Sequence, residues 1–320
     1  MTIDQRRLLG GALAAGLVAA APARAAAGQV AIPGVVEAGA PLVEVHAGGR
    51  WCEGPVWDRR SGTLVFSDVR ADRLLRLGPG GVTPIRDPSN FANGNRVDRQ
   101  GRLVTCEHLG RRLVRQEADG RLTVLADRYQ GRRLNAPNDL AIARDGVIWF
   151  TDPTFGLTQP EEGRMAAPEL PGRYVFRLDP DGTLEVVADA FEQPNGIVFS
   201  PDERTLYVSD TSAADGKEGR REVRAFDVVD GRRLARGRLF ARVETGIPDG
   251  LAVDAAGRVF AATDRGATLW SPDGALLGHI ATPATCGNLA FGGADGRRLF
   301  LCCGTSIYAI ETMTKGAAWA

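Results

Sequence analysis

Apolar and polar residues alternate with a period of two along most of the chain from about residue 51 onward, as in half-buried β-strands. Beyond residue 27 no stretch shows a long period of 3.6 residues. One phrase recurs: a polar residue, usually followed by glycine, then an alternating strand, a small turn and a second apolar strand. It begins six times, at Glu53, Asn93, Asn138, Asn195, Asp249 and Gly287.

Successive phrases start 40, 45, 57, 54 and 38 residues apart, and each unit also carries later strands. Four strands per unit at this spacing are typical of β-propellers. We therefore predict an all-β fold, a single six-bladed β-propeller domain over residues 26–320. An N-terminal strand near 42–45 is expected to complete the last blade and close the ring, and a seven-bladed ring is the alternative.

The first 25 residues predict a signal peptide. Arg6 and Arg7 precede a weakly apolar run at 10–21, and a small-x-small cleavage motif follows at 23–25. The run is too short and too rich in Ala and Gly for a transmembrane helix. The paired arginines favour the twin-arginine route over general secretion. We expect the signal peptide to be removed and the mature protein to be periplasmic or secreted.

Composition limits the range of partners. The chain has 39 basic and 39 acidic side chains, which gives no reason to expect nucleic acid or a membrane as partner. Its five cysteines include no CxxC pair, so a zinc ribbon or a dithiol redox motif is disfavoured and buried free thiols are expected. Spacing alone assigns no disulfide, and the sequence leaves open a monomer or a small homo-oligomer.

The first position of the repeated phrase supplies the candidate chemistry. The first strand of each propeller blade lines the central channel, so these six residues should meet at one height, with an open side at Gly287. Five carry a side-chain oxygen and two of those are carboxylates. This ring favours a divalent cation, Ca²⁺ first, with Mg²⁺, Mn²⁺ or Zn²⁺ as alternatives, although zinc normally recruits His or Cys. Asn and Asp before Gly are also turn formers, but Glu53 does not fit that explanation.

The second strand of each unit returns to the same face of the propeller. In most units this strand ends in an acid that follows Ser or Thr, which indicates a structural hydrogen-bonding pattern between blades. The residues at this position are Asp68, His108, Asp152, Asp210 and Asp264. His108 breaks the pattern and is a candidate substrate contact. Two long inserts leave from this face, at 153–172 and 211–221, and are expected to form pocket walls or a lid.

At these positions the chain resembles the gluconolactonase/regucalcin (senescence marker protein) family. The similarity covers about residues 44–310, and its motifs are Glu53–Trp57, Pro137–Asp139, Trp149–Pro153, Pro194–Gly196 and Pro248–Gly250. The resemblance implies a six-bladed propeller that acts as a metal-dependent sugar lactonase. It places metal ligands at Glu53, Asn195 and Asp249, with Asn138 where the family has an Asn that contacts substrate or metal. It also places the general acid/base at Asp249 and shows Ala136 where the family has a substrate-gripping arginine.

We therefore expect a metal-dependent hydrolase that opens a small, sugar-type lactone. The metal should polarise the carbonyl, a water bound to the metal or activated by Asp249 should attack, and Asp249 should return a proton to the leaving ring oxygen. Candidate substrate contacts are Asn93, His108, Asp152 and Phe155. The alternatives are a Ca²⁺-dependent arylesterase or organophosphate hydrolase on the same site, and a non-enzymatic binding propeller with a structural metal.

Overall fold

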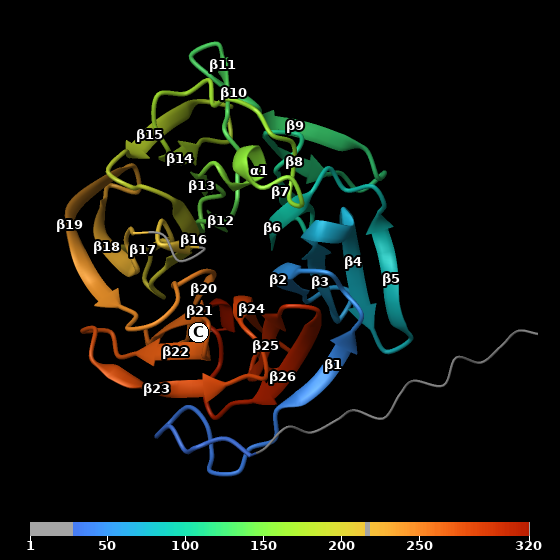
Figure 1. Ribbon diagram of the computed structural model, residues 1–320, viewed down its shortest axis with the longest axis vertical. Helices are drawn as coiled ribbons and strands as arrows, with labels where there is room; N and C mark the ends of the chain where they lie inside the picture. The colour runs from blue at the N-terminus through green and yellow to red at the C-terminus, as the bar shows by residue number, and fades with distance from the viewer. Residues whose placement is uncertain (1–27, 215–217, 320) are drawn as a thin grey trace, which may run out of the picture.

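The computed structural model describes residues 28–214 and 218–319 as six four-stranded antiparallel sheets around one axis (Figure 1). The predicted all-β, six-bladed propeller is confirmed. The predicted signal peptide at 1–25 lies outside the described residues. Within the described ranges, no helix has both the length and the apolar character needed to cross a membrane.

The blades follow one another in chain order, each with its first strand nearest the axis (Figure 1). Blades one and two contain β2 (Cys52–Asp58), β3 (Thr63–Asp68), β4 (Arg73–Gly78), β5 (Gly81–Arg86), β6 (Ala92–Val97), β7 (Leu103–Glu107), β8 (Arg112–Gln116) and β9 (Leu122–Ala126). Blades three and four contain β12 (Leu140–Ile142), β13 (Ile148–Asp152), β14 (Tyr174–Leu178), β15 (Leu184–Ala188), β16 (Pro194–Phe199), β17 (Thr205–Asp210), β18 (Glu222–Val229) and β19 (Arg233–Arg242). Blade five contains β20 (Leu251–Val253), β21 (Val259–Thr263), β22 (Gly266–Trp270) and β23 (Leu276–Ala281).

Blade six is built from both ends of the described chain, because β24 (Cys286–Gly292), β25 (Arg298–Cys303) and β26 (Ser306–Glu311) are completed by β1 (Val43–Ala47). β1 pairs antiparallel with β26, from Val43 opposite Ala309 to Ala47 opposite Ser306. The predicted closure of the ring by an N-terminal strand is confirmed. Because blade six takes a strand from each end of the described chain, the geometry of the axis depends on the N-terminal segment.

Short elements lie outside the blades. They are the hairpin of β10 (Arg128–Tyr129) and β11 (Arg132–Arg133), the helix α1 (Phe155–Thr158), and the 3₁₀ turns η1 (Val69–Ala71) and η3 (Ala317–Trp319). α1 belongs to the 153–172 insert and lies toward the axis, between blades two and three (Figure 1).

The hydrophobic core lies between neighbouring blades, because alternate residues of a strand point to opposite faces of its sheet. In β13, Phe150 packs in a cluster shared with blade two, whereas its neighbour Trp149 packs in a cluster shared with blade four. Trp149 meets Phe199 of blade four edge-on, with ring centroids 5.7 Å apart. The alternation seen in the sequence is therefore two-sided: both faces of a blade are buried, each against a different neighbour.

Close contact between inner strands explains why glycine follows the polar residue of the repeated phrase. A Cβ on Gly54, whose φ is +51°, would lie 2.0 Å from the carbonyl oxygen of Asn93 in the next blade. A Cβ on Gly94 would lie 2.5 Å from the carbonyl oxygen of Asn138, and the Gly94 N–H donates to that oxygen at 2.8 Å. Only glycine lets the inner strands approach this closely.

The predicted hydrogen-bonding pattern at the end of the second strand divides into two parts. The hydroxyl groups connect blades: Ser67 Oγ donates to the Asn93 carbonyl at 2.6 Å, and Ser209 Oγ to the Asp249 carbonyl at 2.8 Å. The acid beside them acts within its own blade, since Asp68 Oδ1 accepts the main-chain N–H groups of Arg50 and Trp51, just before β2.

Two members of the predicted set differ from this pattern. Glu107, rather than His108, is the blade-two counterpart of Asp68, because Glu107 pairs with Ala92 as Asp68 pairs with Cys52. Asp264 lies one residue beyond the end of β21 and is exposed.

Replacement of Gly94 by Ala tests the close contact of the inner strands. We expect Gly94→Ala to lower the free energy of unfolding by about 1–3 kcal/mol, because the added methyl group overlaps the Asn138 carbonyl and the Asp139 backbone. Gly80→Ala is the matched control, since a Cβ there meets nothing within 4 Å. Denaturant unfolding followed by circular dichroism compares the two, and equal stabilities would contradict the packing argument.

Candidate functional site

The polar residues of the repeated phrase are buried together at the axis. Glu53, Asn93, Asn138 and Asn195 are 4–6% exposed, and Asp249 keeps partial exposure. Main-chain contacts of the inner strands hold these positions in sequence around the axis, as the Gly94 N–H does for Asn138. The ring predicted from the sequence is thus built from buried oxygen-bearing side chains on successive blades.

Glu53 fills the side of the ring that the sequence left open. A Cβ on Gly287 would lie 2.1 Å from Glu53 Oε1, so the absence of a side chain at Gly287 makes room for this carboxylate. The expectation of an open side at Gly287 is therefore corrected. The next residue, Asn288, is 2% exposed and hydrogen-bonds the Glu53 carboxylate.

Asn288 is a residue that the sequence reasoning missed. Its Oδ1 accepts the N–H of Leu289 at 2.8 Å, as Asp139 Oδ1 accepts the N–H of Leu140 at 2.9 Å in blade three. The parallel between Asn138–Leu140 and Gly287–Leu289 was visible in the sequence and pointed to Asp139 and Asn288 as equivalent side chains. Asp139 is fully buried, and its Oδ1 lies 3.5 Å from Nη1 of Arg96 in blade two.

Two carboxyl groups of the ring resist ionisation. Burial raises the pKa of Glu53 to about 8, although hydrogen bonds from Asn288 and from the Gly54 N–H act in the opposite direction. Burial, followed by the charge of Glu53, also raises the pKa of Asp249 well above its usual range, against a hydrogen bond from Asn195. Two acids this close are costly to ionise together unless a cation compensates their charge.

The donor set fits a hard divalent cation. In the described part of the chain no three His, Cys, Asp or Glu side chains cluster at metal-binding distance. A cation at the axis would therefore combine the two carboxylates with amide oxygens, as Ca²⁺, Mg²⁺ and Mn²⁺ accept. Asn195 is oriented for this role: its Nδ2 donates to Thr211 Oγ1 at 3.3 Å and it hydrogen-bonds Asp249, which leaves Oδ1 for a cation.

His108 lies beside the ring as a buried neutral base. Its Nδ1 is 3.1 Å from the Glu162 carbonyl oxygen, and its Nε2 is 3.3 Å from Nδ2 of Asn93. A carbonyl can only accept, so the proton belongs on Nδ1 and Nε2 accepts from the Asn93 amide. This arrangement turns Oδ1 of Asn93 away from His108. Burial lowers the pKa of His108 to about 4, which the hydrogen bond to Glu162 only partly offsets.

Asp152 and Phe155 lie at the root of the 153–172 insert. Asp152 is fully buried, and its Oδ2 accepts the Asn135 N–H at 2.8 Å. Burial raises the pKa of Asp152 to about 7, against hydrogen bonds from the Asn135 and Ala136 N–H groups. Phe155 is 8% exposed and begins α1. Direct contact of either side chain with substrate stays a prediction.

α1 covers Ala136, the position at which the family that this chain resembles has an arginine. Ala136 is fully buried, and a Cβ on Gly156 of α1 would lie 3.0 Å from the Ala136 Cβ and 2.6 Å from the His108 Cβ. The helix therefore packs directly on Ala136 and His108, and the wall of the site here is made by the insert.

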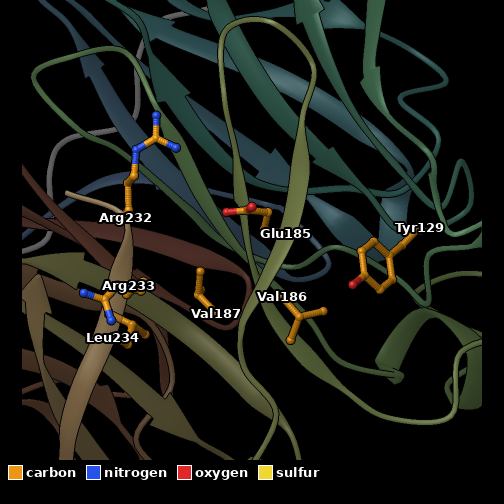
Figure 2. Close-up of a pocket in the computed structure, with 7 residues that line it drawn as sticks. All are labelled: Tyr129, Glu185, Val186, Val187, Arg232, Arg233 and Leu234. Atoms are coloured by element: carbon orange, nitrogen blue, oxygen red, sulfur yellow. The ribbon is translucent and has the colours of Figure 1, made fainter. Parts of the chain in front are cut away.

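A separate pocket of about 480 Å³ lies on the outside of the ring, between the outer strands of blades three and four (Figure 2). Its walls come from β15 and the start of β19, with Tyr129 of β10 at one side, and are formed by Tyr129, Glu185, Val186, Val187, Arg232, Arg233 and Leu234. None of the residues of the axial ring is among them, so this pocket is distinct from the candidate site.

The protonation of His108 is testable directly. We expect ¹⁵N resonances of the His108 ring to show the Nδ1–H tautomer and no titration above about pH 5, because burial disfavours the imidazolium ion. The contribution to stability has a defined sign: a histidine with a lowered pKa stabilises the fold above its unfolded pKa and loses that contribution as pH falls. An Nε2–H tautomer, or titration near pH 6.5, would contradict the assignment.

Known proteins with similar sequences are named as gluconolactonases or related lactonases. The SMP-30/Gluconolactonase/LRE-like region matches residues 51–305. The gluconolactonase of Zymomonas mobilis is 31% identical over 302 residues, which cover 88% of this chain and 84% of that protein. The 6-deoxy-6-sulfogluconolactonase of Pseudomonas putida is 31% identical, covering 78% and 81%.

The solved structures agree with these relatives. A Xanthomonas campestris gluconolactonase superposes with a TM-score of 0.84 at 41% identity, covering 92% of this chain and 99% of that one. The match therefore covers most of the propeller. By sequence and by structure, the chain belongs to the SMP-30/gluconolactonase/LRE-like family.

Proposed function

We propose that the protein is a divalent-metal-dependent lactonase that opens a small sugar-type lactone at the axis of the propeller. The observation that carries the proposal is the pair of carboxyl groups, Glu53 and Asp249, whose pKa values are raised within a ring of amide side chains. Relatives named as gluconolactonases support the choice of a lactone as substrate. We take Ca²⁺ as the first candidate ion because the donors are all oxygen atoms.

The proposed ligands are Glu53, Asn138, Asn195 and Asp249. When bound, a divalent cation supplies electrophilic polarisation of a carbonyl oxygen, which favours attack on an ester. Glu53 suits the role of a cation ligand without a part in proton transfer, since it is 4% exposed, packed against Gly287 and hydrogen-bonded by Asn288. A hydrogen bond from Asn195 also fixes Asp249, which as a residue keeps partial exposure.

Asp249 is the proposed catalytic base and acid. Its partial exposure allows contact with a water molecule and a substrate, and as a carboxylate it can take one proton from the attacking water. The water oxygen bonds to the carbonyl carbon of the lactone. The C–O bond within the lactone ring then breaks, and the same proton passes from Asp249 to the leaving lactone oxygen. The products are a carboxylic acid and a hydroxyl group on one open chain, so the protons balance within the site.

Substrate hydroxyl groups are expected to meet Asn93, whose Oδ1 is turned away from His108. His108 acts here as a positioning residue, because its Nε2 accepts the Asn93 amide and its ring is fully buried. Phe155 supplies an apolar face at the start of α1.

The experiment is a lactone panel on metal-stripped protein reloaded with Ca²⁺, Mg²⁺, Mn²⁺ or Zn²⁺. We expect hydrolysis only with a divalent cation. Asp249→Asn should lower kcat by about 10²–10⁴-fold, since it removes the base. Glu53→Gln and Asn195→Ala should weaken cation binding measured by calorimetry, because each removes an oxygen donor or a charge.

Asp189→Asn is the matched control, since Asp189 is an exposed acid between blades three and four. The same preparations are offered aryl esters and phosphotriesters. Turnover of those compounds without lactone turnover would favour an arylesterase or organophosphate hydrolase. Cation binding with no hydrolysis of any of them would favour a binding propeller, and lactone hydrolysis that survives both metal removal and Glu53→Gln would overturn the mechanism.

A further inference from the structure

Asn135, in the loop that leads into blade three, bonds both ends of the 153–172 insert. It is fully buried, and its Nδ2 lies 3.1 Å from the carbonyl oxygen of Asp152 and 3.0 Å from that of Gly172. Carbonyl oxygens only accept, so the amide nitrogen is the atom that faces them. The main-chain N–H of Asn135 also donates to Asp152 Oδ2 at 2.8 Å. One residue therefore holds the insert where it leaves β13 and where it returns toward β14.

Asn135 is itself fixed from blade two. Nε of Arg111, which is 7% exposed, donates to the carbonyl oxygens of Leu134 at 2.7 Å and of Asn135 at 3.1 Å. The main-chain N–H of Arg111 donates to the His108 carbonyl oxygen at 3.1 Å. The root of the insert is thus connected to His108 through the turn that carries both His108 and Arg111.

The insert also connects Asn135 to the ring of His108. The N–H of Ala136 donates to the carbonyl oxygen of Pro153, the first residue of the insert, at 3.2 Å. α1 begins two residues later, and a Cβ on Gly156 would lie 2.6 Å from the His108 Cβ. Further along the insert, the Glu162 carbonyl oxygen lies 3.1 Å from His108 Nδ1.

The side chain of Glu162 adds an anchor on blade one. Its Oε1 accepts hydrogen bonds from Arg70, from Nε at 3.1 Å and Nη2 at 2.9 Å. This contact fixes the side chain, whereas the carbonyl that meets His108 belongs to the main chain. The direction of the carbonyl therefore follows the path of the insert between its two ends.

We propose that Asn135 is a positioning residue: by fastening both ends of the insert, it presents the Glu162 carbonyl to His108. His108 in turn orients the Asn93 amide toward substrate. The carbonyl keeps the His108 proton on Nδ1, so that Nε2 accepts from Asn93 Nδ2, 3.3 Å away. With the proton on Nε2 instead, the ring would donate, and the Asn93 amide would turn its oxygen to His108. A substrate hydroxyl group would then meet a donor in place of an acceptor.

The first test is made without substrate, on Asn135→Ala, which removes both amide donors at the root. The chain has three histidines, so selective ¹⁵N-histidine labelling gives three ring spectra. We expect the wild-type His108 ring to show the Nδ1–H tautomer alone. Asn135→Ala should show the Nε2–H tautomer as well, because the Glu162 carbonyl is no longer held in place. Amide hydrogen exchange across 154–164 should be about tenfold faster in the variant.

Glu169→Gln is the matched control within the same insert. The Glu169 side chain is 41% exposed and contacts Arg111 Nη1 at 3.2 Å and the Arg133 N–H at 2.8 Å. We expect the wild-type His108 tautomer and exchange rates within about twofold of the wild type, because an exposed ion pair contributes little.

Arg111→Gln decides the matter if melting shows that Asn135→Ala fails to fold. It removes the donors to the Leu134 and Asn135 carbonyls and leaves the Asn135 side chain in place. We expect the same change in the His108 tautomer, with a smaller rise in the rate of exchange.

Turnover supplies the one readout that rests on the proposed lactonase function. We expect Asn135→Ala to raise KM for gluconolactone about threefold to tenfold and to leave kcat within about twofold, since a hydroxyl contact is made in the ground state and the transition state alike. Asn93→Ala should raise KM in the same way. Because Asn135 acts through Asn93, the double variant should raise KM no further than Asn93→Ala does alone.

The outcomes separate this inference from the proposed function. An unchanged His108 tautomer in a folded root variant, or an equal change in Glu169→Gln, would overturn the positioning role. A KM effect of Asn135→Ala that adds fully to that of Asn93→Ala would overturn it as well. Absence of lactone hydrolysis by the wild-type protein would overturn the lactonase proposal instead, and the tautomer and exchange measurements would still decide the role of Asn135.

Discussion

Two neighbouring carboxyl groups, the buried Glu53 and the partly exposed Asp249, are the feature around which the structure is organised. Isolated buried charges are unfavourable, so the fold must either keep these groups protonated or supply a cation. Among the described residues, the hydrogen bonds that Glu53 receives come from an amide and a main-chain N–H. The raised pKa of both acids supports the divalent-cation site that we propose at the axis. The lactonase chemistry that we propose depends on this site.

The propeller holds these groups at one height through contacts that are repeated from blade to blade. Glycine in the inner strand allows the next blade to approach, and a serine or threonine hydroxyl in the second strand binds the carbonyl of the ring residue in the following blade. β1 closes the ring of blades by completing blade six. The insert of blade three then covers one side of the ring, with Glu162 fastened to blades one and two. The inner strands of the repeat thus form the ring of the site, and the 153–172 insert, which is outside the repeat, forms one wall beside it.

The repeated strands could be predicted from the sequence, whereas Asn288 and the Arg70–Glu162 pair could not. Period-two alternation and a recurring polar–glycine phrase are local signals, so six blades and most of the ring were visible. Asn288 was missed because it lies one residue after the register of the ring, at the position that glycine holds in blades one, two, four and five. The Arg70–Glu162 pair joins residues 92 positions apart, one of them in an insert without periodicity. Contacts of that kind depend on the path of a loop, which alternation does not encode.

The central claim is that the axial ring is a cation site, and Mn²⁺ anomalous diffraction tests it most directly. Crystals of the protein loaded with Mn²⁺ should show one strong anomalous peak on the propeller axis, contacted by side-chain oxygens of the proposed ligands Glu53, Asn138, Asn195 and Asp249. Crystals of Glu53→Gln grown in the same way should show a weakened or absent peak. A wild-type crystal with no peak at the axis, or with its strongest site elsewhere, would contradict the account.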